Sequence, residues 1–192
     1  MTTLVIGLLL FLGTHSVRVF ADDWRGAQIA RRGENAYKGV YTLVSLAGLA
    51  LIVWGYGQAR AAPVELFNPP VWTRHAASLL TLISFVLIAA AYAPRNRIRA
   101  ALGHPMVAGV KIWAFAHLIA NGLLADLVLF GAFLAWAVID FRSARRRDRL
   151  AARVIPAGTL SGDAIAVVAG LVAWFAFAFY LHGWLIGVRP FG

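Results

Sequence analysis

The chain has 192 residues, of which 61% are hydrophobic and only 14% are charged, and it contains no cysteine. Soluble domains are about 45–50% apolar and about 25% charged, so an ordinary soluble domain and a disordered tail are both excluded. Without cysteine, thiol catalysis, iron–sulfur clusters, thiolate haem ligation and cysteine zinc sites are excluded as well. The composition predicts one all-α integral membrane domain over residues 1–192, a polytopic transmembrane helical bundle.

Six apolar segments follow one another along the chain, and each is predicted to be a membrane-spanning helix. They cover residues 3–21, 39–56, 73–92, 105–120, 123–139 and 163–182. A span needs about 17–25 residues, so the fourth segment is marginally short. The first segment is too long for the apolar core of a signal peptide and has no basic residue before it, so it is expected to remain as a helix.

The fourth and fifth segments meet at the dipeptide Asn121-Gly122. This dipeptide is typical of turns, and it also suits the C-terminal cap of a helix. A tight helical hairpin is therefore predicted at Asn121-Gly122.

Basic residues gather in alternate connections between the segments. Residues 22–38, 93–104 and 140–162 hold 13 of them, whereas the opposite side has only Arg60, Arg74 and Arg189. The positive-inside rule places the basic connections in the cytoplasm and both termini on the opposite side. Most of the net charge of +10 is therefore explained by basic residues that orient the protein in the membrane. Attraction to anionic membrane lipids is a secondary effect. No nucleic-acid partner is expected, because no nucleic-acid-binding motif is present. The Arg-rich stretch 142–153 is interpreted as a solvated cytoplasmic loop, with docking of a partner as the alternative.

Two of the five histidines, His15 and His117, lie well inside predicted spans. Each stands 12 residues past the start of its segment, a depth of about 18 Å. Because the two helices run in opposite directions through a core of about 30 Å, the two rings are expected within about one helical turn of the same level. An ionisable residue in hydrocarbon needs a partner and marks a candidate functional site.

Two neutral imidazoles on neighbouring helices can act as the axial ligands of one haem iron, and a flat apolar ring suits a helical bundle. The alternative is that each histidine bonds a carbonyl or hydroxyl group of another helix. Zinc is less favoured, because no third ligand is visible at this depth. The residues alone leave haem ligation and structural bonding both open.

Four further residues are candidates for the cofactor site. Arg18 is one turn from His15, within reach of a haem propionate, and Asn121 is one turn after His117. Trp113 could line the pocket, with core packing as its alternative. His104 precedes a proline at a helix start, where a propionate, a lipid phosphate or a nucleotide would be favoured, with simple lipid contact as its alternative.

Three charged residues of the fourth and fifth segments are expected to be structural. Lys111 is predicted to pair with Asp140 and so to lock the hairpin, with snorkelling to the membrane surface as the alternative. Asp126 lies in the first turn of the fifth helix, where the helix dipole favours a carboxylate.

Two stretches resemble the signature of the NnrU family. One is HPMVAGVKIWAFAHLIANG, from His104 to Gly122, and the other is FLGTHS, from Phe11 to Ser16. Asp140 before a basic stretch also matches, and the resemblance covers essentially the whole chain. NnrU proteins are bacterial inner-membrane proteins associated with denitrification and nitric oxide metabolism. The resemblance therefore implies a multi-pass protein of the bacterial inner membrane, and the orientation predicted from the basic residues then makes both termini periplasmic.

The NnrU family is in turn similar to 15-cis-zeta-carotene isomerase, a membrane enzyme that binds haem b through two histidines. One ligand carries over onto His15, which Ser16 follows. The other carries over onto His117, which stands 13 residues after His104. The resemblance thus implies haem b with bis-histidine ligation, and a redox-gated cis–trans isomerisation of a carotenoid or other polyene as the activity.

Two alternatives stay open beside the isomerase. The first is a non-enzymatic haem sensor, electron carrier or assembly factor in nitric oxide metabolism, with nitric oxide as the ligand. The second is a haem-free scaffold or a methyltransferase-like protein that uses S-adenosylmethionine. The methyltransferase alternative rests on Gly103-His104-Pro105, which distantly resembles the Arg-His-Pro motif of isoprenylcysteine carboxyl methyltransferases.

Overall fold

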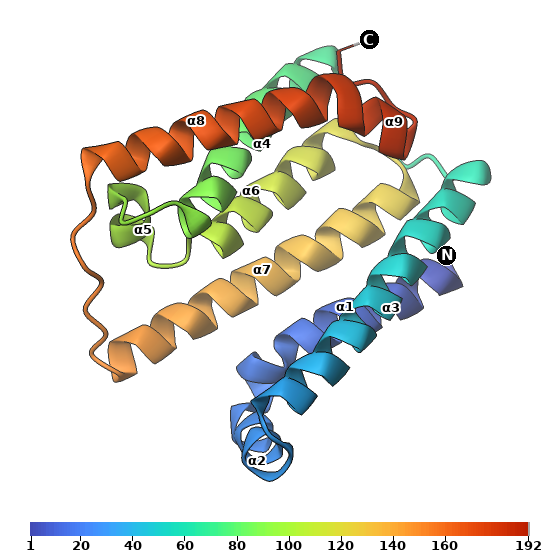
Figure 1. The fold of residues 1–192 in the computed structure, drawn as a ribbon. Coiled ribbons are helices and arrows are strands. Elements are labelled where there is room, and N and C mark those ends of the chain that lie inside the picture. Colours follow the sequence, from blue (N-terminus) through green and yellow to red (C-terminus); the bar gives the residue numbers. More distant parts are fainter. Residues whose placement is uncertain (192) are drawn as a thin grey trace.

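The six predicted spans are all helical in the structure, a computed structural model that describes residues 1–191 (Figure 1). The long helices are α1 (Thr2–Phe20), α3 (Glu34–Ala61), α4 (Val71–Tyr92), α6 (Pro105–Ala120), α7 (Leu124–Leu150) and α8 (Leu160–Ala176). Five helical stretches are long and apolar enough to cross a membrane, and α6 is the shorter apolar helix. The last stretch continues from α8 through a π-helical segment, Phe177–Leu181, into α9 (His182–Ile186). The prediction of an all-α polytopic bundle is confirmed.

Two of the basic connections contain short helices that the apolar pattern does not show. Helix α2 (Asp22–Arg32) has two aspartates in its first turn and two arginines in its last, which complements the helix dipole. Helix α5 (Arg97–Leu102) begins after Asn96, whose side chain accepts a hydrogen bond from the backbone N–H of Arg99. Both are too polar or too short to register as apolar segments.

The Arg-rich stretch is mostly helical rather than a loop. Helix α7 continues to Leu150, well past the predicted end at residue 139, so the prediction of a loop is wrong for residues 142–150. Arginine, alanine and leucine are good helix formers. Arg147 and Arg149 in the last turn are also favourably placed against the helix dipole.

Helix α7 lies between two groups of helices (Figure 1). Helices α1 and α3 form an antiparallel pair on one side, and α4, α6 and α8 pack together on the other. Both α1 and α6 pack on α7, but among the described residues their backbones do not contact each other. Side chains that project from α1 and α6 beside α7 can therefore meet only across the space between the two helices.

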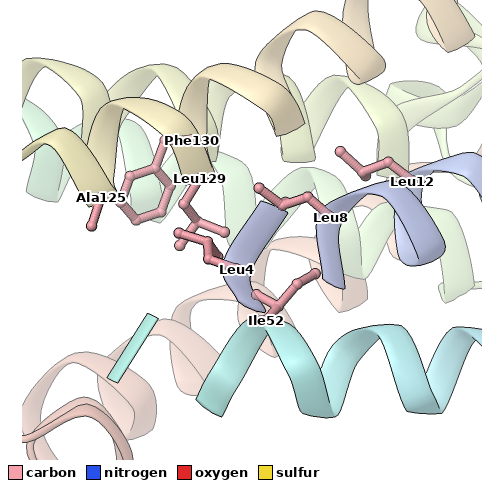
Figure 2. Close-up of a cluster of buried hydrophobic side chains, with 7 residues drawn as sticks. All are labelled: Leu4, Leu8, Leu12, Ile52, Ala125, Leu129 and Phe130. Atoms are coloured by element: carbon pink, nitrogen blue, oxygen red, sulfur yellow. The ribbon is translucent and has the colours of Figure 1, made fainter. Parts of the chain in front are cut away.

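The main apolar core lies where α1, α3 and α7 meet. Its buried members are Leu4, Leu8, Leu12, Ile52, Ala125, Leu129 and Phe130 (Figure 2). The three leucines of α1 recur every fourth residue, so they form one stripe along the helix. Figure 2 shows Leu4 and Leu8 on the side of α1 that faces Leu129 and Phe130 of α7.

Glycines allow α1 and α3 to pack with their backbones in close contact. A Cβ atom on Gly7 would lie 2.6 Å from the backbone nitrogen of Ile52, and one on Gly48 would lie 2.7 Å from that of Phe11. A Cβ on Gly55 would overlap the backbone of Leu4. Small residues that let helix backbones approach are typical of helix pairs in membranes.

The predicted hairpin at Asn121-Gly122 is present. Helix α6 ends at Ala120 and α7 begins at Leu124, and the Asn121 side chain donates a hydrogen bond to the backbone carbonyl of His117. The loop that precedes α4 covers the turn, because the Leu66 N–H donates to the carbonyl oxygen of the buried Gly122. This contact ties the α3–α4 connection to the α6–α7 hairpin.

Candidate cofactor site

His15 projects from α1 into a set of aromatic side chains. Its Nδ1 lies 2.7 Å from the carbonyl oxygen of Phe11, and its ring stacks on the Phe11 ring with centroids 4.2 Å apart. Tyr41 of α3 and Trp136 of α7 complete the surroundings, at 5.2 and 6.0 Å between centroids. A carbonyl only accepts hydrogen bonds, so Nδ1 carries the proton and Nε2 keeps its lone pair.

His117 on α6 has the same local geometry. Its Nδ1 lies 2.8 Å from the carbonyl oxygen of Trp113, which again leaves Nε2 with the lone pair. Its ring stacks on the buried Phe130 of α7 at 4.5 Å and lies 5.1 Å from the Trp113 ring. Both histidines are therefore held by their own helices in the tautomer that a metal ligand needs.

The two imidazoles lean toward one level of the bundle. Each hydrogen bond draws its ring back toward the N-terminus of its own helix, and α1 and α6 run in opposite directions. Phe133 of α7 marks the common level, because its ring lies 5.8 Å from Phe11 and 5.5 Å from Trp113. His15 and His117 thus flank an aromatic cluster made of Phe11, Trp113 and Phe133.

The histidines are offset more than the sequence analysis expected. His15 contacts Trp136 and His117 contacts Phe130, and these partners stand six residues apart on α7. Six residues correspond to about 9 Å along a helix, rather than one turn.

Two buried polar groups near His15 lack hydrogen-bond partners within the part of the chain that the structure describes. They are the Trp136 Nε1–H and the Ser45 hydroxyl group. Trp136 contacts His15 directly. The glycine contacts pair positions 55 with 4 and 48 with 11, so the same antiparallel register places position 45 opposite Thr14. An unsatisfied buried donor costs about 1–3 kcal/mol, so both groups favour a polar partner from outside the chain.

These residues fit a bis-histidine haem. Among the described residues, no group of three or more His, Cys, Asp or Glu side chains could hold a metal ion. A haem iron, however, needs only two axial protein ligands. The two Nε2 lone pairs, the aromatic cluster between them and the unsatisfied Trp136 N–H match a flat apolar ring with a polar edge.

The other predicted site residues fall into three places. Trp113 and Asn121 are beside His117, since Trp113 provides its carbonyl and Asn121 donates to the carbonyl of His117. Arg18 is exposed at the end of α1, where its carbonyl oxygen lies 3.5 Å from Nη1 of Arg147. His104 is 13 residues before His117, about 20 Å away along α6.

His104 instead belongs to an ionic contact between α6 and the end of α7. Its Nε2 lies 2.8 Å from Oδ2 of Asp148, and Nη1 of Arg153 lies 3.3 Å from Oδ1 of the same carboxylate. The sequence analysis did not find this contact, because the two helix ends come together only in the folded bundle.

The structure contradicts the prediction made for Lys111 and agrees with the one made for Asp126. Lys111 does not pair with Asp140 in the structure. Its Nζ lies 4.7 Å from the centre of the Phe141 ring, so the predicted ion pair is wrong. Asp126 is structural as expected, because its Oδ2 accepts the backbone N–H of Leu123 at 3.1 Å. Asp126 is only 3% exposed, and the Tyr56 hydroxyl of α3 donates to its other oxygen.

The sequence did not predict which aromatic residues surround the histidines. These residues are Tyr41, Phe133 and Trp136. Trp136 stood out as a tryptophan deep in a span, but its contact with His15 depends on how α1 packs on α7. Tyr41 stands 26 residues after His15, and no local pattern links the two. Their contact follows from the close packing of α1 on α3.

The fold defines a polytopic helical membrane protein, with two histidines that are each hydrogen-bonded to a carbonyl of their own helix. The family model described as NnrU protein matches residues 3–190, nearly the whole chain. The chain therefore belongs to the NnrU family. No curated protein and no solved structure matches it.

Proposed function

We propose that this protein binds haem b inside the membrane, with His15 and His117 as the two axial ligands. The observation that carries the proposal is the matched geometry of the two histidines. Each has Nδ1 bonded to a carbonyl of its own helix, and both lean toward the same aromatic cluster from opposite sides. Two histidines with separate structural roles would not need to lean toward the same cluster.

The chain's own residues would hold and orient the cofactor. The carbonyl groups of Phe11 and Trp113 fix the tautomer and the angle of each imidazole. The apolar neighbours exclude water, and Trp136 offers a buried N–H. When bound, haem would supply electron transfer, binding of nitric oxide or activation of a polyene double bond.

For the activity, we propose redox-gated cis–trans isomerisation of a polyene, on the strength of the family resemblance. A non-enzymatic role in nitric oxide metabolism, as a sensor, an electron carrier or an assembly factor, is the second candidate. The two are separated by titrating the haem-loaded protein with carotene and with nitric oxide. Conversion of the carotene isomer on reduction favours the enzyme, whereas a spectral response to nitric oxide alone favours the second candidate.

The first experiment is an absorption spectrum of the protein purified in mild detergent after expression with ample haem. We expect a sharp Soret band, split visible bands after reduction with dithionite, and haem b in a pyridine haemochrome assay. A colourless protein would contradict the proposal. It would leave a haem-free scaffold or binding of S-adenosylmethionine near His104 to be tested.

We also propose that the protein lies in the bacterial inner membrane with both termini in the periplasm. The basic helices α2 and α5 and the arginines at the end of α7 lie at one end of the bundle, which supports this orientation. The chain has no cysteine, so single cysteines can be introduced as reporters. A cysteine in place of Arg146 is expected to resist a membrane-impermeant thiol reagent in intact cells, and one in place of Thr2 is expected to react. The reverse pattern would contradict this orientation.

A further inference from the structure

Arg147 of α7 reaches back toward the region of His15. Its Nη1 lies 2.7 Å from the hydroxyl oxygen of Ser143 and 3.5 Å from the carbonyl oxygen of Arg18 on α1. Ser143 stands seven residues after Trp136, so it lies on the same face of α7, two turns or about 10 Å further on. The guanidinium group therefore lies beside α1 near Ser143, on the face of α7 that also carries Trp136.

Arg147 is available for an anion. In the described part of the chain, no carboxylate lies within ion-pair distance of it, whereas Arg97 and Arg153 each have an aspartate partner. Asp140 is the one acidic residue on the α7 face between Trp136 and Ser143, and Arg18 adds a second cation at the same end of α1. The α1–α7 interface therefore has a net positive charge, because the two arginines, Arg18 and Arg147, outnumber the single aspartate, Asp140.

The two donors have different characters, and together they suit a carboxylate. Trp136 offers a neutral, buried N–H, and its ring lies 6.0 Å from the His15 ring. Arg147 is half-buried and offers a charged, planar fork, the geometry that matches a carboxylate best. The aromatic cluster and these donors together form a site that is apolar on one side and binds an anion on the other.

We infer that Trp136 and Arg147 bind the propionate edge of the cofactor, so that this edge faces the basic end of the bundle. This inference rests on the proposed binding of haem, and it assigns to α7 the anchoring that the sequence suggested for Arg18 or His104. Haem has its two carboxylates on one edge of an otherwise apolar ring. Their placement next to Arg147 therefore fixes which way round the ring lies between the two histidines.

The test compares haem b with its dimethyl ester, in which both propionates are neutral. The cofactor-free protein in detergent is titrated with each compound, and the dissociation constant is read from the Soret band. Arg147→Gln is expected to weaken haem b binding about tenfold or more, the effect of losing a charge-assisted hydrogen bond. Its binding of the ester is expected to match that of the wild type. Trp136→Phe keeps an aromatic ring but loses the N–H, and it is expected to weaken haem b about threefold.

Arg146 is a matched control, since it is the exposed neighbour on the same turn of α7. Arg146→Gln makes the same change in charge and is expected to leave both dissociation constants unchanged. If Arg147→Gln does not fold, Arg147→Lys serves instead, because it keeps the charge and loses the planar fork. Its binding of haem b should be weakened about threefold, with the ester unaffected.

The outcomes separate this inference from the proposed function. If Arg147→Gln weakens haem b and the ester equally, or weakens neither, the anchoring role is overturned while bis-histidine binding stands. If the wild type binds the ester as tightly as haem b, with a low-spin spectrum, the same conclusion follows. If the wild type binds neither compound, both the inference and the proposed function are overturned.

Discussion

Replacing either His15 or His117 with alanine is expected to abolish the low-spin haem spectrum. Each variant removes one of the two nitrogen ligands and leaves the iron with one strong axial ligand. The change affects the ligand directly, because each Nε2 is the only nitrogen that the helix carbonyl leaves free. The measurement is the Soret and visible spectrum of the reduced and oxidised protein, together with the haem content per chain.

His75 and His182 are the matched controls for this experiment. His75 lies in the first turns of α4, and His182 begins α9, where its Nδ1 contacts the carbonyl oxygen of Val188 at 2.7 Å. His182 also has Nδ1 bonded to a backbone carbonyl, although this one lies six residues later rather than four residues earlier, so it tests whether that tautomer alone is enough to ligate. His75→Ala and His182→Ala are expected to keep the low-spin spectrum. Retention of the spectrum in both His15→Ala and His117→Ala would refute the assignment, and its loss in His182→Ala would assign a different ligand pair.

Added imidazole distinguishes loss of a ligand from loss of the fold. In a folded His15→Ala variant, free imidazole can enter the space of the missing ring and ligate the iron. We therefore expect the low-spin spectrum to return when imidazole is added in excess. A variant that has unfolded would not recover, and its thermal transition would also be absent.

Gly55→Ala is expected to destabilise the bundle more than any other single methyl group added to α3. A Cβ at this position would overlap backbone atoms of Leu4 rather than a flexible side chain, so α1 must move away. Overpacking of this kind costs about 1–3 kcal/mol. Because α1 holds His15, the variant should also lose part of its haem. Thermal unfolding in detergent and haem content are the two measurements.

Gly57 is the matched control, two residues further along α3. A Cβ at Gly57 would meet nothing within 4 Å, and alanine is the better helix former by about 0.8–1.0 kcal/mol. Gly57→Ala should therefore be neutral or stabilising. Equal thermal transitions for the two variants would show that α1 and α3 are not in close backbone contact.

The sequence predicted the apolar helices well because lipid imposes a simple length and composition on them. Even the short helix α6 has the predicted bounds, because Pro105 suits a helix start and Asn121-Gly122 suits a turn. The apolar pattern missed α2 and the end of α7, since polar helices at a membrane surface have no such signature. Their signals are capping residues and propensity, which are weaker.

Pairs of distant residues could not be predicted in the same way. The contact of His104 with Asp148 joins residues 44 positions apart, and that of Tyr56 with Asp126 joins residues 70 positions apart. Each depends on which helices become neighbours. Counting residues placed His15 and His117 well inside their helices, but it underestimated the offset between them and could not give their aromatic surroundings. The expected pair of Lys111 with Asp140 failed because the lysine lies over the ring of Phe141 instead.

The order in which the helices are synthesised determines when the aromatic cluster can form. His15 leaves the ribosome more than a hundred residues before Phe133 and Trp136. The hairpin of α1 and α3 can insert and close on itself before then, since its glycine contacts are internal to the pair. The site is built only when α7 inserts against both α1 and α6. A cofactor that lies between these helices is therefore loaded late, into a chain that is already largely in the membrane.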